Sequence, residues 1–143
     1  MILVDTSVWI DYFRGAATPQ TEVLDDLLAD EPLYTGDLIL TEVLQGFRKD
    51  NEFQRAKDVL LSLDVIELGG HDVALKAAQN YRTLRKAGVT VRNTMDTIIA
   101  TRCIEGGFRL LHDDRDFDPF VTHLGLKSVI DRPPARTLNE RPA

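Results

Sequence analysis

The segment Ile2-Leu3-Val4-Asp5 contains a short, unbroken apolar run that ends in a carboxylate. A run this short, with β-branched residues at both ends, predicts a strand that is buried on both faces of a parallel sheet. Thr6 and Ser7 follow, and one of them is expected to cap a helix that begins near Val8. Asp5 is therefore expected at the carboxyl end of a central strand, which is the edge where open α/β sheets bind ligands.

Short apolar runs and amphipathic helices alternate along the rest of the chain. Strands are expected at residues 2–4, 33–35, 64–68, 108–111 and 127–130. Helices are expected at residues 8–14, 19–29, 38–47, 53–63, 72–86 and 95–105, the last of them capped by Thr94. This alternation with short connections predicts an α/β fold, a three-layer α/β/α sandwich with a central parallel sheet of four to five strands.

The length and composition are those of one ordinary domain. The chain has 143 residues, and no apolar run approaches the ~20 residues that cross a bilayer. Its start lacks the pattern of a signal peptide, and the single cysteine, Cys103, excludes an internal disulfide and fits a reducing cytoplasm. Residues 131–143 contain three prolines and no aromatic residue, so we expect a flexible tail after a domain at residues 1–130.

Acidic residues recur where the expected elements reach the carboxyl edge of the sheet. Glu42 and Asp96 each lie on a largely apolar helix stripe, and Asp114 and Asp116 follow the strand at residues 108–111. Taken singly, each acid has a structural explanation, such as a helix cap or a favourable place in a first turn. Several independent placements at one edge instead indicate a site that these acids share with Asp5.

Carboxylates that meet in this way need a compensating cation. Two carboxylates ~5 Å apart repel by roughly 3 kcal/mol at an effective dielectric of 20, so several cannot all stay ionised without one. Their hard oxygen atoms favour Mg²⁺ or Mn²⁺ over Zn²⁺. Such a site suits the metal-assisted hydrolysis of a phosphodiester.

The net charge of −6 at first argues against a nucleic-acid ligand, because phosphate contacts require Lys and Arg. The five candidate carboxylates account for five of these negative charges, so the remaining surface is close to neutral. We hypothesise a local basic track for RNA, with scattered solvated charge as the alternative. The residues of this track would be Arg14, Arg48, Lys49, Arg82, Arg85, Lys86 and Arg92.

Four stretches of the chain resemble the motifs of PIN-domain ribonucleases, in particular the VapC toxins of bacterial toxin–antitoxin pairs. They are residues 4–10 (VDTSVWI), 41–46 (TEVLQG), 96–100 (DTIIA) and 110–117 (LLHDDRDF). Each motif is short, but the ordered set covers nearly the whole expected domain and carries the resemblance.

The resemblance implies a PIN-like α/β/α fold and a Mg²⁺-dependent endoribonuclease, with Mn²⁺ as a substitute metal. The substrate would be structured RNA such as tRNA or rRNA. The residues implied for metal binding and catalysis are Asp5, Glu42, Asp96 and Asp114, with Asp116 as a further acidic metal ligand.

Two residues beside these acids also receive roles from the resemblance. The hydroxyl of Thr6 would orient Asp5. The position before Asp113 often holds Thr or Ser in the family, and here it is His112. Either His112 donates a hydrogen bond to a site carboxylate or a phosphate, or it is a packing substitution, which we favour.

The implied partners are a small VapB-type antitoxin, which would block the acidic site and bind operator DNA, and a second copy of the chain. The helix with Trp9 and Tyr12 would lie partly in this homodimer interface. The alternatives are an RNA-processing PIN nuclease outside a toxin–antitoxin pair and a non-catalytic PIN scaffold. A scaffold has no need of mutually repelling carboxylates. A response-regulator receiver is disfavoured because Asp5 has no acidic neighbour and Lys127 opens its strand.

Overall fold

A five-stranded parallel sheet lies at the centre of the computed structural model, which describes residues 1–131. The strands are β1 (Ile2–Val4), β2 (Leu33–Gly36), β3 (Asp64–Ile66), β4 (Arg109–Leu111) and β5 (Lys127–Ser128). The helices are α1 (Thr6–Arg14), α2 (Pro19–Asp30), α3 (Asp37–Leu44), α4 (Asp50–Leu61), α5 (His71–Lys86), α6 (Thr94–Gly106), α7 (Asp118–Leu124) and the 3₁₀ helix η1 (Arg115–Phe117). The expected tail at residues 131–143 lies outside the described residues, apart from Asp131.

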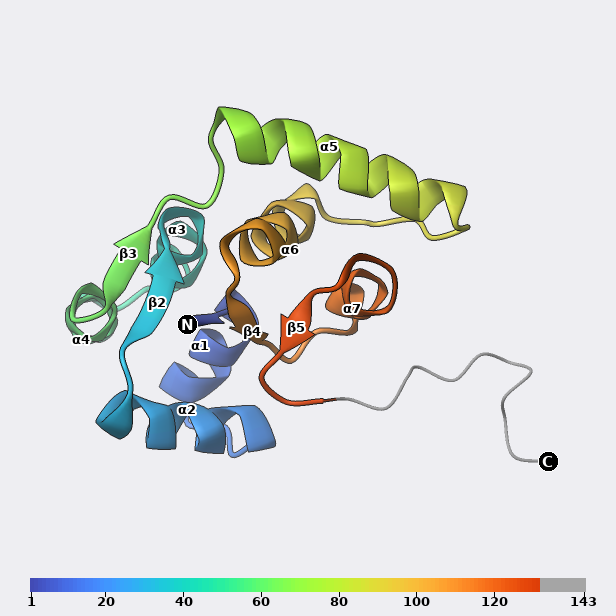
Figure 1. Ribbon diagram of the computed structural model, residues 1–143. Helices are drawn as coiled ribbons and strands as arrows, with labels where there is room; N and C mark the ends of the chain where they lie inside the picture. The colour runs from blue at the N-terminus through green and yellow to red at the C-terminus, as the bar shows by residue number, and fades with distance from the viewer. Residues whose placement is uncertain (132–143) are drawn as a thin grey trace.

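The order of the strands places β1 in the middle of the sheet. This order is β3-β2-β1-β4-β5, and all the pairings are parallel. The chain moves outward from β1 through β2 to β3 and then returns to form β4 on the other side of β1 (Figure 1). The direction of winding therefore reverses between β1 and β4, and open α/β sheets bind ligands beyond the carboxyl ends of strands at such a switch point.

Helices cover both faces of the sheet and form the outer layers. Figure 1 shows α1 and α2 on one face and α5 and α6 on the other. Helix α3 contacts α1 and α4, and α7 contacts α5. This arrangement confirms the predicted three-layer α/β/α fold. Across residues 1–131, every helix is too short or too polar to cross a bilayer.

The core forms around β1 and the aromatic face of α1. Leu3 and Val4 are fully buried, as expected for a strand covered on both faces. Trp9 is also fully buried, and its ring stacks on Phe13 with a centroid distance of 5.8 Å. The ring of Phe47 meets Phe13 edge-on at 5.9 Å. Trp9 therefore packs inside the protomer and not at a subunit interface.

The N-caps of α1 and α6 each lie one or two residues earlier than expected, because a capping side chain bonds to a backbone N–H farther along the chain. Asp5, and not Thr6 or Ser7, caps α1 by accepting a hydrogen bond from the backbone N–H two residues later. Asn93, and not Thr94, caps α6 in the same way. An N-cap side chain bonds to the N–H of the second or third helical residue, so both caps lie just outside their helices.

Other differences concern short elements. Helix α3 ends at Leu44 instead of residue 47, and β5 covers residues 127–128 instead of 127–130. The segment after β4 contains η1 and α7, which the periodicity did not predict. Elements of three and seven residues are too short to show a helical repeat of apolar residues.

Replacing Leu3 by Ala should lower the free energy of unfolding by about 2–5 kcal/mol, because it leaves a cavity beside the central strand. The single tryptophan, Trp9, is buried, so its fluorescence in a urea titration reports unfolding. The control is Leu75→Ala on α5, where the side chain is 58% exposed and the expected change is below about 0.5 kcal/mol. Equal losses in the two variants would contradict a buried β1.

Candidate functional site

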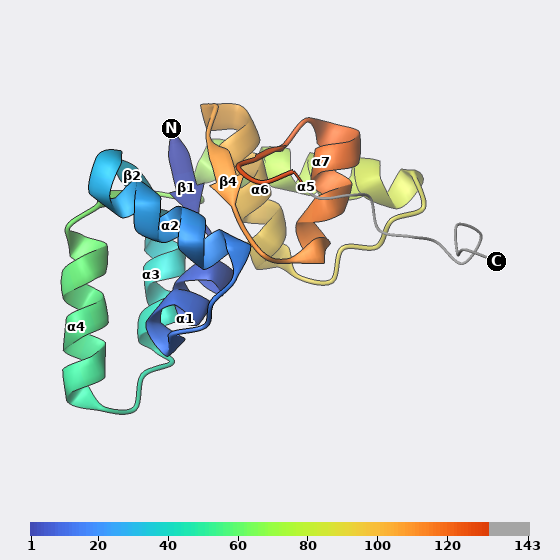
Figure 2. The same cartoon turned by 90° about the horizontal axis from the view of Figure 1, so that it is seen from below.

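Asp5 is held at the carboxyl end of β1 by the helix that it caps. Its Oδ2 atom accepts hydrogen bonds from the backbone N–H of Ser7 at 3.1 Å and from the Ser7 hydroxyl at 2.6 Å. Its own N–H donates to the carbonyl oxygen of Leu111, the last residue of β4, at 2.9 Å. Figure 2 shows β1 running from the N-terminus toward α1. Asp5 thus lies at the switch point between β1 and β4.

The segment that follows β4 brings further acids to this point. Asp114 caps η1, and its Oδ1 atom accepts a hydrogen bond from the N–H of Asp116 at 2.9 Å. The hydroxyl of Ser7 accepts a hydrogen bond from the N–H of Asp113 at 3.3 Å while it donates to Asp5. One serine hydroxyl therefore joins the end of β1 to the segment after β4.

Asp96 completes a compact group of acids from the opposite layer of helices. It lies in the first turn of α6 and is buried. Carboxylate oxygens of Asp96, Asp114 and Asp116 all lie within 4.8 Å of one another. Three hard oxygen ligands at this spacing fit a divalent cation such as Mg²⁺ or Mn²⁺.

The electrostatics of Asp5 and Asp96 reflect this crowding. Burial raises the pKa of Asp5 to about 6, although the hydrogen bonds from Ser7 act in the opposite direction. Burial, together with the negative charges of the other four candidate acids, raises the pKa of Asp96 to about 7. The structure thus brings the other four predicted acids within electrostatic reach of Asp96. A bound cation would relieve this repulsion.

Glu42 reaches the site from α3, and its contact corrects the expected role of Thr6. The hydroxyl of Thr6 donates to Oε1 of Glu42 at 2.8 Å, whereas Ser7 supplies the hydroxyl that bonds to Asp5. Thr6 is the first residue of α1 and turns toward α3, while the capping carboxylate bonds to the second residue. Ser7 was expected only as a possible helix cap, and its place two residues after an acid at a strand end was the signal for its contact with Asp5.

His112 is buried behind the acids. Its Nδ1 atom accepts a hydrogen bond from the N–H of Asp114 at 3.4 Å, so Nε2 carries the hydrogen and donates to the hydroxyl of Ser128 at 2.9 Å. The ring also contacts Phe117, with a centroid distance of 4.9 Å. These contacts support the packing interpretation and add a role in holding the backbone of Asp114.

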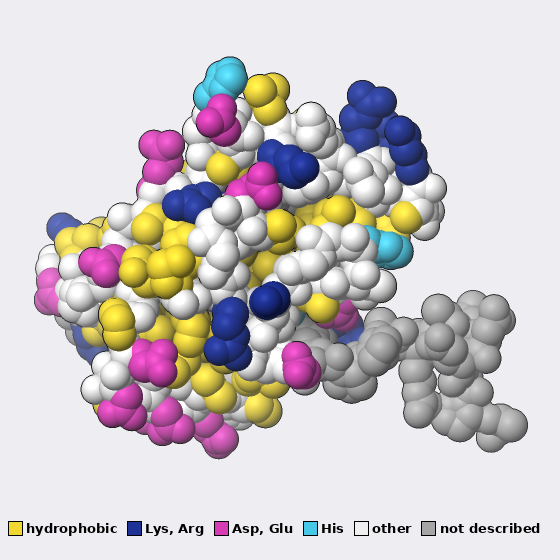
Figure 3. All heavy atoms as spheres, in the orientation of Figure 1, with side chains coloured by type: hydrophobic (Ala, Val, Ile, Leu, Met, Phe, Trp, Pro, Cys, Tyr) yellow, Lys and Arg dark blue, Asp and Glu magenta, His cyan; other side chains and the backbone are white. Residues whose placement is uncertain are grey.

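The candidate basic residues lie at separate places around the site. Arg92 donates from Nη2 to Oδ1 of Asp116 at 2.9 Å, and this bond raises the pKa of Arg92. Arg85 and Lys86 occupy the last turn of α5, where Figure 3 shows basic side chains together at the end of the helix. Arg82 lies one turn earlier in α5. Arg48 and Lys49 are exposed between α3 and α4.

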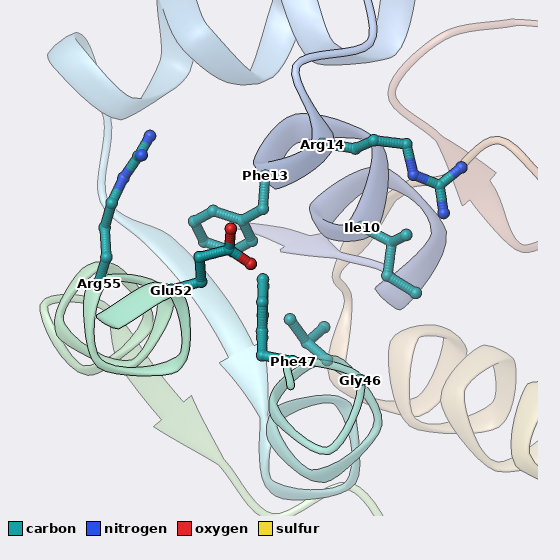
Figure 4. Close-up of a pocket in the computed structure, with 8 residues that line it drawn as sticks. Ile10, Phe13, Arg14, Gly46, Phe47, Glu52 and Arg55 are labelled. Carbon is teal, nitrogen blue, oxygen red and sulfur yellow. The ribbon is translucent and has the colours of Figure 1, made fainter. Parts of the chain in front are cut away.

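A groove of about 540 Å³ lies along α1 and α3. Ile10 and Gly46 line it. Ile10 follows Thr6 by four residues, and Gly46 follows Glu42 by four residues, and Thr6 and Glu42 are joined by a hydrogen bond. Figure 4 shows two phenylalanine rings in the groove, with Arg14 and Arg55 on opposite sides. The remaining lining residues are Phe13, Val43, Phe47 and Glu52. The groove thus combines an aromatic and aliphatic floor with charged side chains of both signs.

Comparison with known proteins gives one consistent result. A family profile described as PIN domain matches residues 2–120. VapC ribonuclease Mb1587 of Mycobacterium bovis and ribonuclease VapC11 of Mycobacterium tuberculosis are each 34% identical to the chain over 131 residues. Each match covers 90% of this chain and 98% of the relative.

Two solved structures have the same fold. VapBC2 from Rickettsia felis, bound to a DNA fragment from its promoter, gives a TM-score of 0.70 at 19% identity, with 90% of this chain and 97% of the other covered. VapC20 of Mycobacterium tuberculosis, described as a toxin that cleaves the sarcin–ricin loop, gives a TM-score of 0.65 at 21% identity. This match covers 93% of this chain and 100% of the other.

The raised pKa values of Asp5 and Asp96 predict that the metal-free protein loses stability as the pH rises from about 4 to 8. In this range the folded protein retains protons that the unfolded chain has released, so stability falls with pH. Asp96→Asn should flatten the plot of Tm against pH, whereas Asp25→Asn, at an exposed acid of α2, should not.

The same experiment with millimolar Mg²⁺ tests the metal. The cation binds ionised carboxylates of the folded protein, so it should raise Tm more at pH 8 than at pH 5. A Tm that does not respond to Mg²⁺ or Mn²⁺ at either pH would contradict a metal site.

Proposed function

Because the chain belongs to the PIN domain family, we propose that it is an endoribonuclease toxin that cleaves RNA at this acidic site. The family profile covers most of the chain, and the curated VapC ribonucleases match it over nearly their whole length. The observation that carries the proposal is the meeting of five acids at the switch point between β1 and β4. A chain used only as a scaffold would not need this cluster.

The proposed cofactor is Mg²⁺, for which Mn²⁺ can substitute. Its ligands would come from Asp96, Asp114 and Asp116, with Asp5 and Glu42 beside them. When bound, the cation supplies positive charge to the RNA phosphate and makes a water molecule more acidic.

The other polar residues of the site hold these acids in place. Ser7 orients Asp5, and Thr6 orients Glu42. His112 holds the backbone N–H of Asp114. Each contact limits the motion of a carboxylate that repulsion would otherwise displace, so the acids are preorganised for a cation and a phosphate.

We further propose structured RNA, such as tRNA or rRNA, as the substrate. A structured RNA presents phosphates over a wide surface, and the chain carries basic residues at the end of α5 and between α3 and α4. These cations would contact phosphates on either side of the cut and offset the net charge of −6.

The proposed regulator is a small antitoxin of the VapB type. The groove along α1 and α3 can hold a segment of such a partner that carries both apolar and charged side chains, and its residues Ile10 and Gly46 follow Thr6 and Glu42 by four residues. A chain seated there could therefore reach and cover the acids. The solved VapBC2 structure contains both proteins on promoter DNA, which supports this partner and contact with operator DNA through it. We also propose that the chain forms a homodimer and acts in the cytoplasm.

Purified protein should cut total RNA into discrete fragments in the presence of Mg²⁺, and EDTA should stop the reaction. Asp5→Asn and Asp96→Asn keep the side-chain shape but remove a charge, so each should lower the cleavage rate at least 100-fold, or about 2.7 kcal/mol. Sequencing of the fragment ends would identify the target.

Controls separate this proposal from its alternatives. Asp25→Asn should cleave as the unchanged protein does. Addition of the cognate antitoxin should stop cleavage, whereas an RNA-processing nuclease would have no such inhibitor. A folded protein that cuts no RNA with either Mg²⁺ or Mn²⁺ would favour the scaffold.

Neutralising the end of α5 should weaken RNA cleavage without changing the chemistry at the acids. For the double variant Arg82→Gln/Arg85→Gln we expect KM to rise about tenfold while kcat changes little, and the dependence on salt to weaken. The matched control is Arg109→Gln/Lys127→Gln, which removes two cations from the opposite edge of the sheet. Equal KM values in the two double variants would show that the α5 charges are merely solvated.

A further inference from the structure

Arg92 connects two loops that border the acidic site. It lies in the segment between α5 and α6, four residues before Asp96, and its guanidinium donates to Oδ1 of Asp116 in η1 at 2.9 Å. The two side chains differ in exposure, since Arg92 is 79% exposed and Asp116 only 30%. The carboxylate is thus partly enclosed, and the arginine that it binds lies at the surface.

This contact distinguishes Asp116 from the other acids of the group. One of its oxygens is already bonded to a cation of the chain itself. Asp96 and Asp114, by contrast, form no ion pair with a Lys or Arg among residues 1–131. Asp116 is therefore the member of the group whose charge the protein neutralises without a metal.

The guanidinium of Arg92 has donors left after it binds Asp116. Arginine carries five N–H donors in a planar fork, which matches the oxygens of a phosphate. The bond to Asp116 accounts for Nη2, and the high exposure leaves the other nitrogens accessible. Arg85 is placed differently, because its guanidinium lies over the ring of Tyr81, 5.6 Å from the centroid.

A phosphate that approaches the acids meets strong repulsion unless positive charge lies beside them. Arg92 supplies such a charge next to Asp96 and Asp114, and its bond to Asp116 lowers the conformational entropy lost on binding an anion. We propose that Arg92 binds a phosphate of the RNA substrate beside the cleavage site, and that Asp116 acts mainly by positioning Arg92. This inference rests on the proposed RNA cleavage and changes the role of Asp116 within it.

The first test measures RNA binding apart from cleavage. An Asp96→Asn parent silences cleavage, and its affinity for fluorescently labelled bulk tRNA is measured by anisotropy in Mg²⁺ between 50 and 200 mM salt. Arg92→Ala in this parent should raise the Kd for tRNA about five- to tenfold. It should also reduce the slope of log Kd against log salt concentration by about 1, as the loss of one phosphate contact predicts. Asp116→Asn should raise Kd in the same direction, and the double variant should be no weaker than Arg92→Ala.

The second test measures metal binding without RNA, in protein with Asp96 intact. Asp116→Asn should leave the Kd for Mn²⁺ within about threefold of the unchanged value, whereas Asp114→Asn should raise it at least tenfold. Arg109→Ala, at the amino end of β4, is the control in the RNA test and should leave tRNA affinity unchanged. Thermal melting confirms that each variant is folded.

The outcomes separate this inference from the function on which it rests. If Arg92→Ala binds tRNA as Arg109→Ala does, Arg92 holds no phosphate. If Asp116→Asn raises the Kd for Mn²⁺ as much as Asp114→Asn does, Asp116 is a metal ligand and the proposal that it positions Arg92 is wrong. A parent that binds no tRNA overturns the proposed function itself, and this inference with it.

Discussion

The repulsion among carboxylates at the carboxyl edge of the sheet is the constraint on which the rest of the structure depends. Asp5, Asp96 and Asp114 come from three separate elements, and burial together with the charges of the neighbouring acids raises the pKa of the first two. A folded chain with such a cluster gives up stability at neutral pH. The rest of the fold must supply enough stability to keep the acids together.

The architecture meets this need through a rigid centre. Strand β1 is paired on both sides and buried on both faces, so Asp5 extends from the least mobile part of the sheet. The N-termini of α1 and α6 both lie at the site, and the positive ends of their dipoles favour the acids there. The Ser7 hydroxyl and the His112 ring connect these acids to the neighbouring segments.

The same crowding that costs stability creates affinity for a cation and, through it, for a phosphate. Two sources of positive charge accompany the acids. Arg92 bonds directly to Asp116, whereas the cations at the end of α5 form no ion pair with an acid among residues 1–131. A protein with a net charge of −6 can therefore engage RNA locally, because most of its excess charge is concentrated where a metal neutralises it. The groove along α1 and α3 offers a protein partner a separate surface of apolar and charged side chains.

The sequence by itself determined the fold class, the central position of β1 and the five acids, because apolar periodicity and strand-end carboxylates are local patterns. It did not determine which hydroxyl serves which acid, since the turn of α1 directs Thr6 to Glu42 and leaves Ser7 for Asp5. The sequence also did not predict the short elements η1 and α7, because they depend on packing after β4. Only the tertiary structure decided the pairing of Arg92 with Asp116, because 24 residues separate them in the chain and the two loops meet only when the sheet is formed.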